Sequence, residues 1–412
     1  MMKRLGDIAE FINGGAWSDK EYTDNGIPVV KVTNLKNGSV DLSEVNYIPE
    51  SSLDKYGRHI LRKGDLVIAT VGSHPNLVAS AAGRATIIPS IAEGALLNQN
   101  ALCIRTNNEF LNQGYLGYLG KSDLFQGYVK SVGRGAANQV RIALGLIKEF
   151  SFELPPLPTQ RKIASILSAY DDLIENNLKR IKLLEEKAQL HYKELMQEMS
   201  YSKTKREEYI KDCLAFYIGG GWGEEDYKEK FTEPAYVIRG TDIPDTRGGN
   251  VSGIPLRFHK TSNLESRKMQ VGDIVFEISN GQINNIGRTV LISKRLLGQF
   301  NQPVMCASFA KLIRVNEKVS PEFFYLYLNE GQENGLLYQY KSNSANGINN
   351  FAFETFIDEV KITIPKETEL KAFTEKVKPI FTLISTLGEQ NSKLREARDI
   401  LLPKLMNGQI EV

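Results

Sequence analysis

The residue types that carry out catalysis or hold metal ions are present but do not form the pattern of an active site. The histidines lack the spacing of metal ligands; they are His59, His74, His191 and His259. A nuclease core needs paired acids with a nearby Glu-x-Lys to hold Mg²⁺, and Asp245 followed by Glu265-Ser266-Arg267 matches it poorly. We therefore expect no metal site and no catalytic residues in this chain.

Sequence motifs for nucleotide and cofactor binding are also missing. The chain has no GxxxxGK[ST] phosphate-binding loop and no GxGxxG after a predicted strand. It has no Asp/Asn-Pro-Pro-Tyr/Phe, the signature of amino-methyltransferases. Gly219–Gly223 resembles a glycine loop, but no phosphate-binding helix clearly follows it. We therefore expect a protein that is not an enzyme and has no cofactor of its own.

Composition indicates a globular protein with two or three domains. The 412 residues are 42% hydrophobic and 24% charged, which is ordinary for a soluble protein. No apolar run is long enough to span a membrane, and the N-terminus turns polar too early for a signal peptide. Three widely spaced cysteines indicate reduced thiols in a cytoplasm. The net charge of +2 neither excludes nor supports nucleic-acid binding.

The elements that would position any functional residues occur twice, about 200 residues apart. The matching segments keep their order along the chain. They pair FINGGAW (11–17) with YIGGGW (217–222), TNL (33–35) with TDI (241–243), GDLVI (64–68) with GDIVF (272–276), Gly83-Arg84 with Gly287-Arg288, LNQ (97–99) with FNQ (300–302), and ANQV (137–140) with ANGI (345–348). The interiors have diverged, which indicates one scaffold that carries two different surfaces.

Each copy is predicted to be an α+β unit, with a β-rich globular part followed by a long helix. Short apolar runs after turn residues predict strands at 26–32, 65–71, 85–88 and 273–278, and short helices are expected at 114–124 and 321–330. The predicted domains are a first globular domain at 1–154, a long helix at 155–204, a second globular domain at 205–364 and a second long helix at 365–412.

The two long helices carry a narrow heptad seam and are expected to pair as an antiparallel coiled coil. The seam residues include Ile163, Leu167, Ile174, Asn177, Ile181, Leu184, Val377, Ile384, Leu387, Asn391, Leu394 and Leu401. A polar residue on such a seam usually fixes the register, as Asn177 and Asn391 would do. The alternative is that each helix packs on its own globular domain. Pro379 and Gly388 predict a kink or break in the second helix.

Two segments give the chain a family resemblance. LPPLPTQRKIASIL (154–167) and DLIENN (172–177) look like the domain junction of type I restriction–modification specificity subunits. The opening KRLGDI (3–8) and the ending LLPKLMNGQI (401–410) are also similar to that family. The resemblance covers the whole chain.

The resemblance implies two target recognition domains that are held apart by the paired helices. Each domain would read one half of a split double-stranded DNA sequence. The helices would act as a spacer and as docking sites for two methyltransferase subunits, and restriction subunits can join such complexes. S-adenosylmethionine would be bound by the methyltransferase partner, and ATP and Mg²⁺ by the restriction partner.

Loops rich in amide, hydroxyl and basic side chains are then the candidates for DNA contact, because these groups bond to base edges and phosphates. In the first half they are Gly14, Gly15, Trp17, Lys31, Thr33, Asn34, Ser73, His74, Asn76, Arg84, Arg134, Asn138 and Gln139. In the second half they are Trp222, Arg239, Thr241, Asn280, Gln282, Asn284, Asn285, Arg288, Lys341, Asn346 and Asn349. We expect replacement of Asn284 and Asn285 by alanine to relax one half-site only.

Some of these candidates have an equally plain structural reading. Arg84 and Arg288 recur in both halves, which favours a scaffold or phosphate role over base reading. Trp17 and Trp222 follow the glycine loops and could pack beneath them. The main alternative for the whole chain is an interaction scaffold whose coiled coil joins proteins without reading DNA.

Overall fold

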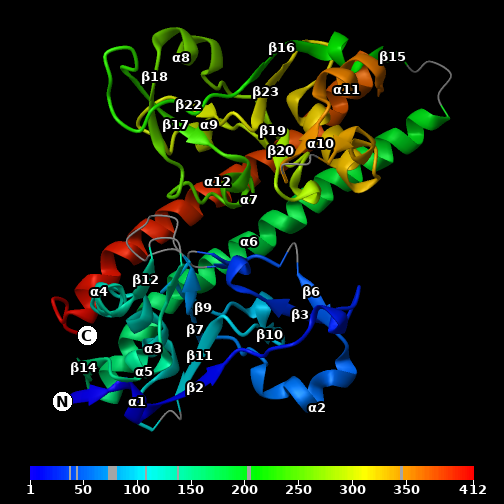
Figure 1. The fold of residues 1–412 in the computed structure, drawn as a ribbon. Coiled ribbons are helices and arrows are strands. Elements are labelled where there is room, and N and C mark those ends of the chain that lie inside the picture. The colour runs from blue at the N-terminus through cyan, green and yellow to red at the C-terminus, as the bar shows by residue number, and fades with distance from the viewer. Residues whose placement is uncertain are drawn as a thin grey trace. The chain divides into compact units, whose positions relative to one another are not determined.

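The computed structural model describes residues 1–412 apart from 37–38, 43–44, 73–80, 107–108, 137–138, 202–205 and 344–346. At 134–136 and 139 it describes the backbone alone. The chain divides into two compact units (Figure 1): residues 1–172 with 395–412 form unit 1, and residues 173–394 form unit 2. The division crosses both long helices, α6 (Leu157–Ser200) and α12 (Glu367–Met406), so each helix contributes to both units.

A four-stranded antiparallel sheet with the same strand order lies in each unit. In unit 1 the order is β2 (Ala9–Asn13), β11 (Ala101–Thr106), β7 (Leu66–Ala69) and β9 (Ala85–Ile87). In unit 2 it is β16 (Leu214–Gly219), β23 (Ala310–Val315), β19 (Ile274–Glu277) and β21 (Thr289–Leu291). The central strands β7 and β19 are buried along their whole length, as their continuous apolar runs predict.

Three smaller sheets also recur. β1 (Met2–Arg4) with β14 (Ser151–Glu153) corresponds to β15 (Arg206–Tyr209) with β26 (Lys361–Ile364). The order β10 (Leu96–Leu97), β3 (Ile27–Val30), β6 (Asn46–Ile48) corresponds to β22 (Val304–Cys306), β17 (Glu233–Ile238), β18 (Leu256–His259). The order β12 (Arg134–Ala136), β13 (Gln139–Arg141), β8 (Val71–Gly72) corresponds to β24 (Lys341–Ser342), β25 (Asn349–Phe351), β20 (Ser279–Asn280). Unit 1 adds the pair β4 (Leu35–Lys36) and β5 (Ser39–Val40). The duplication seen in the sequence is therefore a duplication of topology.

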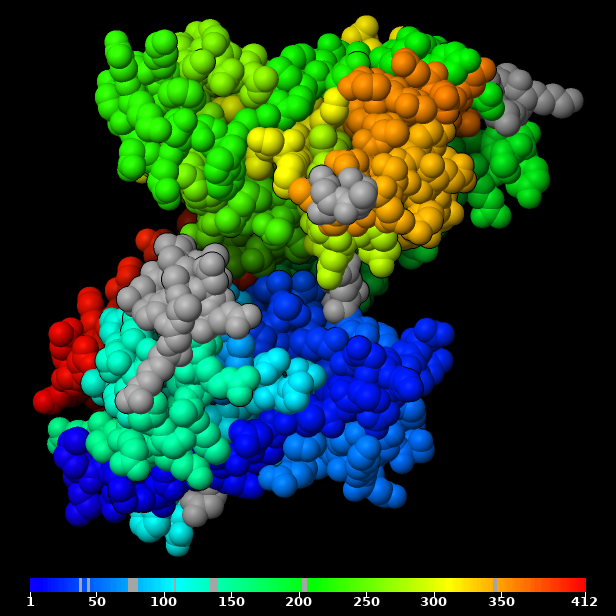
Figure 2. Space-filling model, viewed as in Figure 1, coloured from blue at the N-terminus to red at the C-terminus, as the bar shows by residue number. Residues whose placement is uncertain are grey.

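Each unit has an apolar core on either face of the four-stranded sheet, and unit 1 has a third cluster of Ile27, Val29, Ile48, Tyr56 and Leu96. In unit 2, Ile274 and Phe276 of β19 pack with α10 (Pro321–Glu333), whereas Val275 packs on the opposite side with Ile238 and Val304. Within unit 2, Figure 2 shows the green surface of β17 and β18 as one lobe and the orange surface of α10 and α11 (Phe353–Glu359) as another. Successive side chains of β19 thus point to opposite faces of the sheet, as they do in any β-strand.

Short helices cover one side of each sheet. In unit 1, α3 (Gln113–Lys121) is capped by Asn112, and α4 (Asp123–Val132) is capped by Ser122. The helix predicted at 114–124 is therefore two helices, because Ser122 ends one and begins the next. α10 is capped by Ser320 and has proline in its first turn. Other short helices are α1 (Leu5–Ile8), α2 (Leu53–Tyr56), α5 (Leu144–Lys148), α7 (Ile243–Arg247), α8 (Thr261–Arg267) and α9 (Lys294–Leu297).

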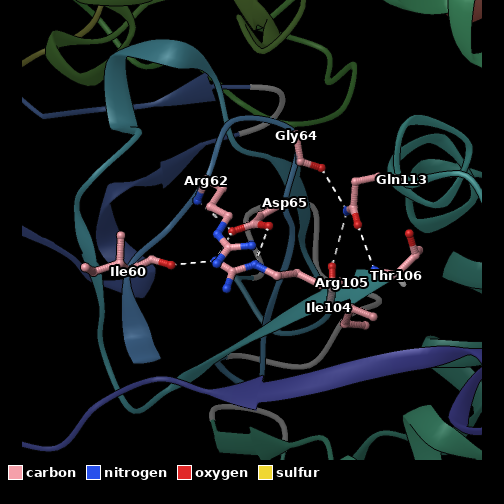
Figure 3. Close-up of polar contacts among 8 residues, drawn as sticks. All are labelled: Ile60, Arg62, Gly64, Asp65, Ile104, Arg105, Thr106 and Gln113. Atoms are coloured by element: carbon pink, nitrogen blue, oxygen red, sulfur yellow. Dashed lines mark hydrogen bonds and ion pairs between the residues drawn. The ribbon is translucent and has the colours of Figure 1, made fainter. Parts of the chain in front are cut away.

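An ion pair between a buried aspartate and an arginine recurs at the start of the central strand in both units. In unit 1, both carboxylate oxygens of Asp65 accept bonds from Arg105, at 2.6 and 2.7 Å, and Oδ2 also accepts from the Arg62 backbone N–H (Figure 3). The bond to Asp65 raises the pKa of the Arg105 guanidinium. In unit 2, Arg314 holds Asp273 at 2.7 and 2.9 Å in the same way. The Gly-Asp turns of the repeat are therefore anchors of the scaffold.

The long helices pair antiparallel within each unit. In unit 2, Asn177 Nδ2 of α6 donates to Asn391 Oδ1 of α12 at 3.0 Å, and Lys376 of α12 lies 3.5 Å from Glu194 of α6. Asp171 and Arg398 form an ion pair between the same helices in unit 1. The α+β class with paired long helices, predicted from the sequence, is confirmed.

The seam residues contact more than the partner helix. Ile163, Leu167 and Leu401 join the core of unit 1 beneath its sheet. Leu184, Val377 and Ile384 join the corresponding core of unit 2, and Ile174, Ile181 and Leu387 are buried, while Leu394 is partly buried. Pairing and packing on the globular parts therefore occur together and are not alternatives.

The expected break in the second helix is wrong, since α12 is continuous through Pro379, Gly388 and Pro403. Val377 and Ile380, on either side of Pro379, are buried in unit 2 and hold the helix together across the lost backbone bond. Gly388 lies against Gly249, where an added Cβ on Gly249 would come 1.9 Å from the Gly388 carbonyl oxygen. Gly388 therefore allows a close approach to the helix and does not interrupt it.

Candidate nucleic-acid interface

The glycine loops are part of the scaffold in both units. Gly14 and Gly15 donate to the carbonyls of Ala101 and Leu97, and Gly220 and Gly221 donate to those of Ala310 and Cys306. A Cβ on Gly14 would lie 1.9 Å from a backbone oxygen, and one on Gly220 2.2 Å. These glycines allow close backbone packing, and their N–H groups are already bonded and so are not open to phosphate.

The two tryptophans after these loops have different surroundings. Trp17 donates to the Tyr22 hydroxyl at 3.1 Å and packs edge-on against Tyr56. Trp222 is 38% exposed, and the Arg257 guanidinium lies 4.4 Å above its ring. Trp222 thus offers an exposed aromatic ring stacked with Arg257, whose side chain is only 16% exposed, and unit 1 lacks this arrangement at Trp17. Sequence reasoning missed Arg257, since no motif links it to Trp222.

The segments after β3 and β17 form matching 3₁₀ turns. Asn34 is buried; its Oδ1 accepts from the Lys31 backbone and its Nδ2 donates to the Asp41 carbonyl. Asp242 accepts from the Arg239 backbone and side chain in the corresponding turn. The hydrogen bond to Asp242 raises the pKa of Arg239. Asn34 therefore holds the turn together.

The exposed residues of these turns are Thr33 and Thr241, which stand at equivalent positions. Lys31 is half-buried; its Nζ donates to Asn46 and lies over the Tyr22 ring. Arg84 donates to the Leu35 carbonyl at 2.6 Å, and burial lowers the pKa of its guanidinium. The backbone of Arg288 bonds to Glu277 and Asn285. The scaffold role predicted for the recurring arginines is thus supported by contacts at Arg84.

The loop that follows β19 in unit 2 is an ordered network of amide side chains. Asn285 is 8% exposed and donates through Nδ2 to Gln282 Oε1 at 3.1 Å and to Asn280 Oδ1 at 3.4 Å. Asn280 donates to Glu277 at 2.7 Å. Asn284 and Gln282 are exposed. The expectation that Asn285 reads DNA together with Asn284 is therefore corrected, because Asn285 is buried and braces the loop.

Residues of the neighbouring strands complete this network. Asn349 donates to the Gly281 carbonyl at 3.0 Å. Ser279 donates to Asn350 Oδ1 at 2.7 Å, a contact that the sequence analysis did not single out. Lys341 donates to Gln332 at 3.2 Å, and burial lowers the pKa of its ammonium group. Asn349 thus ties strand β25 to Gly281 in the loop.

Several candidates cannot be placed in this network. Ser73, His74, Asn76, Asn138 and Asn346 lie outside the described residues, as do the side chains of Arg134 and Gln139. The backbones of Arg134 and Gln139 begin β12 and β13. The candidates themselves remain predictions from the sequence.

A small cavity inside unit 2 lies between α6, α7, α12 and β21. Its volume is about 70 Å³, and Glu185, Arg247 and Tyr325 are among the residues that line it. Burial raises the pKa of the Glu185 carboxyl, and the nearby Arg247 opposes this. Pockets for drug-sized ligands typically occupy ~300–1,000 Å³. This cavity therefore has room for water but not for S-adenosylmethionine or ATP.

Among the residues that the structure describes, no three acidic, histidine or cysteine side chains are grouped so that they could hold a metal ion. None of the helices in the described part of the chain is both long and apolar enough to cross a membrane. The three cysteines are free and buried.

Residues 1–186 match the family model of the type I restriction modification DNA specificity domain. This part of the chain is similar to the type I restriction–modification specificity subunits, a family named for DNA sequence specificity.

Several specificity subunits of this kind align with all of the chain or with part of it. The MjaIX specificity subunit of Methanocaldococcus jannaschii is 24% identical over 100% of this chain and 93% of its own length. The EcoKI specificity subunit of Escherichia coli is 20% identical over 94% of this chain and 83% of its own length. The EcoAI specificity subunit of E. coli is 27% identical over 46% of this chain and 31% of its own length. A type I S subunit from M. genitalium, known from its crystal structure, is 16% identical over 98% and 95% with a TM-score of 0.49.

Proposed function

We propose that this chain recognises a split DNA sequence, one half with each unit, and directs methyltransferase subunits to it. The observation that carries the proposal is the duplication of topology combined with unlike surfaces. The sheets, turns and buried ion pairs recur in the two units. The polar surfaces differ, since Trp17 is packed against Tyr56 whereas Trp222 is exposed beneath Arg257. A shared scaffold with different surfaces suits two unlike half-sites.

The paired helices are the proposed spacer and docking surface. α6 and α12 are the segments through which the chain passes between the units. Leu183 and Leu190 of α6 are 64% and 59% exposed, which supports contact with a protein partner. We expect two methyltransferase subunits, one for each half of the repeat, and restriction subunits in complexes that also cut DNA.

The chemistry of methylation and cleavage belongs to the partners in this proposal. S-adenosylmethionine would be bound by the methyltransferase subunits, and ATP with Mg²⁺ by restriction subunits. This chain would contribute binding and position only. We place it in the cytoplasm, where the DNA is accessible and the free thiols of Cys103, Cys213 and Cys306 stay reduced.

Sequencing of methylated bases across the genome tests the proposal directly. Cells with and without this gene are compared, and the deletion strain is complemented with the intact gene. We expect one bipartite methylated motif to disappear on deletion and to return on complementation. If every motif persists in the deletion strain, the specificity function is wrong.

The same experiment distinguishes the rival function of a scaffold that joins proteins without reading DNA. In that case deletion would leave every methylated sequence intact while a protein complex is lost. Affinity purification of the full chain reports the complex independently of the motif. Loss of the motif together with recovery of a methyltransferase on the full chain supports the proposed function over the scaffold.

A further inference from the structure

The exposed end of the amide network in unit 2 separates into a braced part and an open part. We define the amide tip as Asn280, Gly281, Gln282, Asn285 and Asn349. Asn280 Oδ1 accepts from the Gln282 backbone at 2.8 Å, and Asn280 Nδ2 donates to Glu277. Asn285 is nearly fully buried, and its Nδ2 donates hydrogen bonds to both Asn280 Oδ1 and Gln282 Oε1. Asn280 and Asn285 therefore hold the tip in one conformation.

The open part consists of one donor and one acceptor. Gln282 is exposed and its Oε1 is fixed by Asn285 at 3.1 Å, so its Nε2 points away from that bond. Asn349 Nδ2 is fixed by the carbonyl of Gly281, the residue beside Gln282, which leaves its Oδ1 open. Neither Gln282 Nε2 nor Asn349 Oδ1 has a hydrogen-bond partner among the residues that the structure describes.

One fixed donor and one fixed acceptor match the groups of one base edge in the major groove. Adenine presents the N7 acceptor beside the N6 amino donor. Guanine presents two acceptors, which would set its O6 against Asn349 Oδ1. Cytosine and thymine each present a single polar group there, so one of the two amides would remain unpaired.

We infer that the amide tip reads an adenine in the half-site recognised by unit 2. Gln282 Nε2 donates to adenine N7, and Asn349 Oδ1 accepts from the N6 amino group. Asn280 and Asn285 are positioning residues that touch no base. This inference rests on the proposed function and names the base class that one of its two surfaces selects. Preorganised side chains lose little entropy on binding, which favours such a contact.

The test uses the full chain with its methyltransferase partner and duplexes that carry the methylated motif found in the genome. Each adenine of both half-sites is replaced in turn by 7-deazaadenine, which lacks the N7 acceptor, or by purine, which lacks the 6-amino group. We expect a single adenine at which each analogue weakens binding about tenfold, as loss of part of a bidentate contact requires.

Matched variants assign the contact to atoms. Gln282→Ala should bind the 7-deazaadenine duplex as well as the normal duplex, and Asn349→Ala should be indifferent to loss of the amino group. Gln270→Ala is the control, since Gln270 is an exposed amide of the same unit whose side chain lies outside the tip. It should keep the full tenfold sensitivity to both analogues. Thermal melting of each variant checks that the unit remains folded.

The possible outcomes distinguish a failure of this inference from a failure of the proposed function on which it rests. If no bipartite motif is lost on gene deletion, the proposed function fails. If the motif exists but no adenine couples to Gln282 or Asn349, the inference alone is wrong. If Asn349→Ala unfolds unit 2, Gln282→Ala still decides the matter through the 7-deazaadenine duplexes.

Discussion

Buried charges in this chain are held by bonds that the repeat reproduces. Asp65 and Asp273 are almost fully buried, and each receives two bonds from one arginine and one from a backbone N–H. Breaking such a pair is costly because the remaining charge stays buried without a partner. The Gly-Asp segments recur in the sequence because the fold needs this anchor twice, independently of any base that either unit reads.

Replacement of Asp65 by alanine should destabilise unit 1 strongly. Arg105 would stay buried without a counter-charge, and the Arg62 N–H would lose its acceptor, at a cost of about 3–5 kcal/mol. Amide hydrogen exchange of β7 and β11 in urea measures the change. The control Asp7→Ala breaks the Arg4–Asp7 pair, which is more than half exposed, and should have little effect. Equal effects of the two variants would contradict the argument.

His259 gives unit 2 a sensitivity to acid. It is fully buried and neither ring nitrogen has a partner among the described residues. Burial, and next the charge of Arg267, lower its pKa below the ordinary 6.5. The unfolded chain therefore takes up a proton below about pH 6.5 that the folded chain refuses, so stability falls as the pH falls from there toward the folded pKa.

The variant His259→Phe should weaken this pH dependence, since it has no group to titrate. The urea midpoint of unit 2 is measured at about pH 7.5 and pH 5.5 in both proteins, a range that brackets the ordinary pKa. The loss on acidification should be smaller in the variant. His191→Gln, which changes a histidine on α6, serves as the control and should keep the full loss. An unchanged loss in His259→Phe would assign the acid sensitivity to other groups.

At the scale of the elements, a buried pair of asparagines helps to hold the two long helices in register. Asn177 and Asn391 are 7% and 0% exposed and bond to each other. Asn391 also donates to the Gly248 carbonyl at 3.2 Å, which ties the helix pair to the loop after α7 within unit 2. A one-residue slip of either helix would leave these amides buried and unpaired, so the pair selects one alignment.

Single and double replacements of these asparagines should give different results. Asn391→Leu leaves Asn177 and the Gly248 carbonyl without partners and should cost about 1–3 kcal/mol in the stability of unit 2. Asn177→Leu with Asn391→Leu should cost less than the sum of the two single changes, because no lone amide remains on the seam. Chemical denaturation of the four proteins in a double-mutant cycle measures the coupling. Strict additivity would show that the bond does not contribute.

The contact between Gly388 and Gly249 predicts opposite effects of the same substitution. Gly388→Ala adds a Cβ that would lie 3.4 Å from Gly249 Cα, an ordinary contact, and should stabilise α12 by about 0.5–1 kcal/mol. Gly249→Ala places a Cβ against the Gly388 carbonyl at a positive φ of 76° and should destabilise unit 2. Thermal melting of both variants measures whether the melting temperature rises for Gly388→Ala and falls for Gly249→Ala. Destabilisation by both would mean that the approach tolerates no added atom.

The sequence predicted the elements far better than the contacts. Helices, strands and the repeat depend on local periodicity and turn residues, as at Gly64-Asp65 and along the seam of α6. Contact sites depend on which side chains the tertiary structure buries. Asn284 and Asn285 are neighbours of one type, yet Asn284 is exposed and Asn285 is buried. The expected break at Gly388 failed for the same reason, because Gly249 lies far away in the sequence.

At the scale of the whole molecule, each long helix contributes one part to unit 1 and the other part to unit 2. The first part of α6 and the last part of α12 belong to unit 1, whereas the rest of both helices belongs to unit 2. Each unit is therefore completed by a segment from the other half of the sequence. A change of helix length at the division, between 172 and 173 and between 394 and 395, leaves the contacts inside each unit intact.

An insertion of seven residues at both of these points therefore tests the helices as a spacer. One heptad adds about 10 Å to each helix and keeps the seam in phase. At ~3.4 Å per base pair, the unspecified stretch between the half-sites should lengthen by about three base pairs. Genome-wide methylation mapping of cells that carry the variant should show both half-sites unchanged. An insertion in α6 alone shifts its seam residues by one heptad relative to those of α12 and should abolish methylation. If the double insertion leaves the spacing between the half-sites unchanged, the helices do not set that spacing.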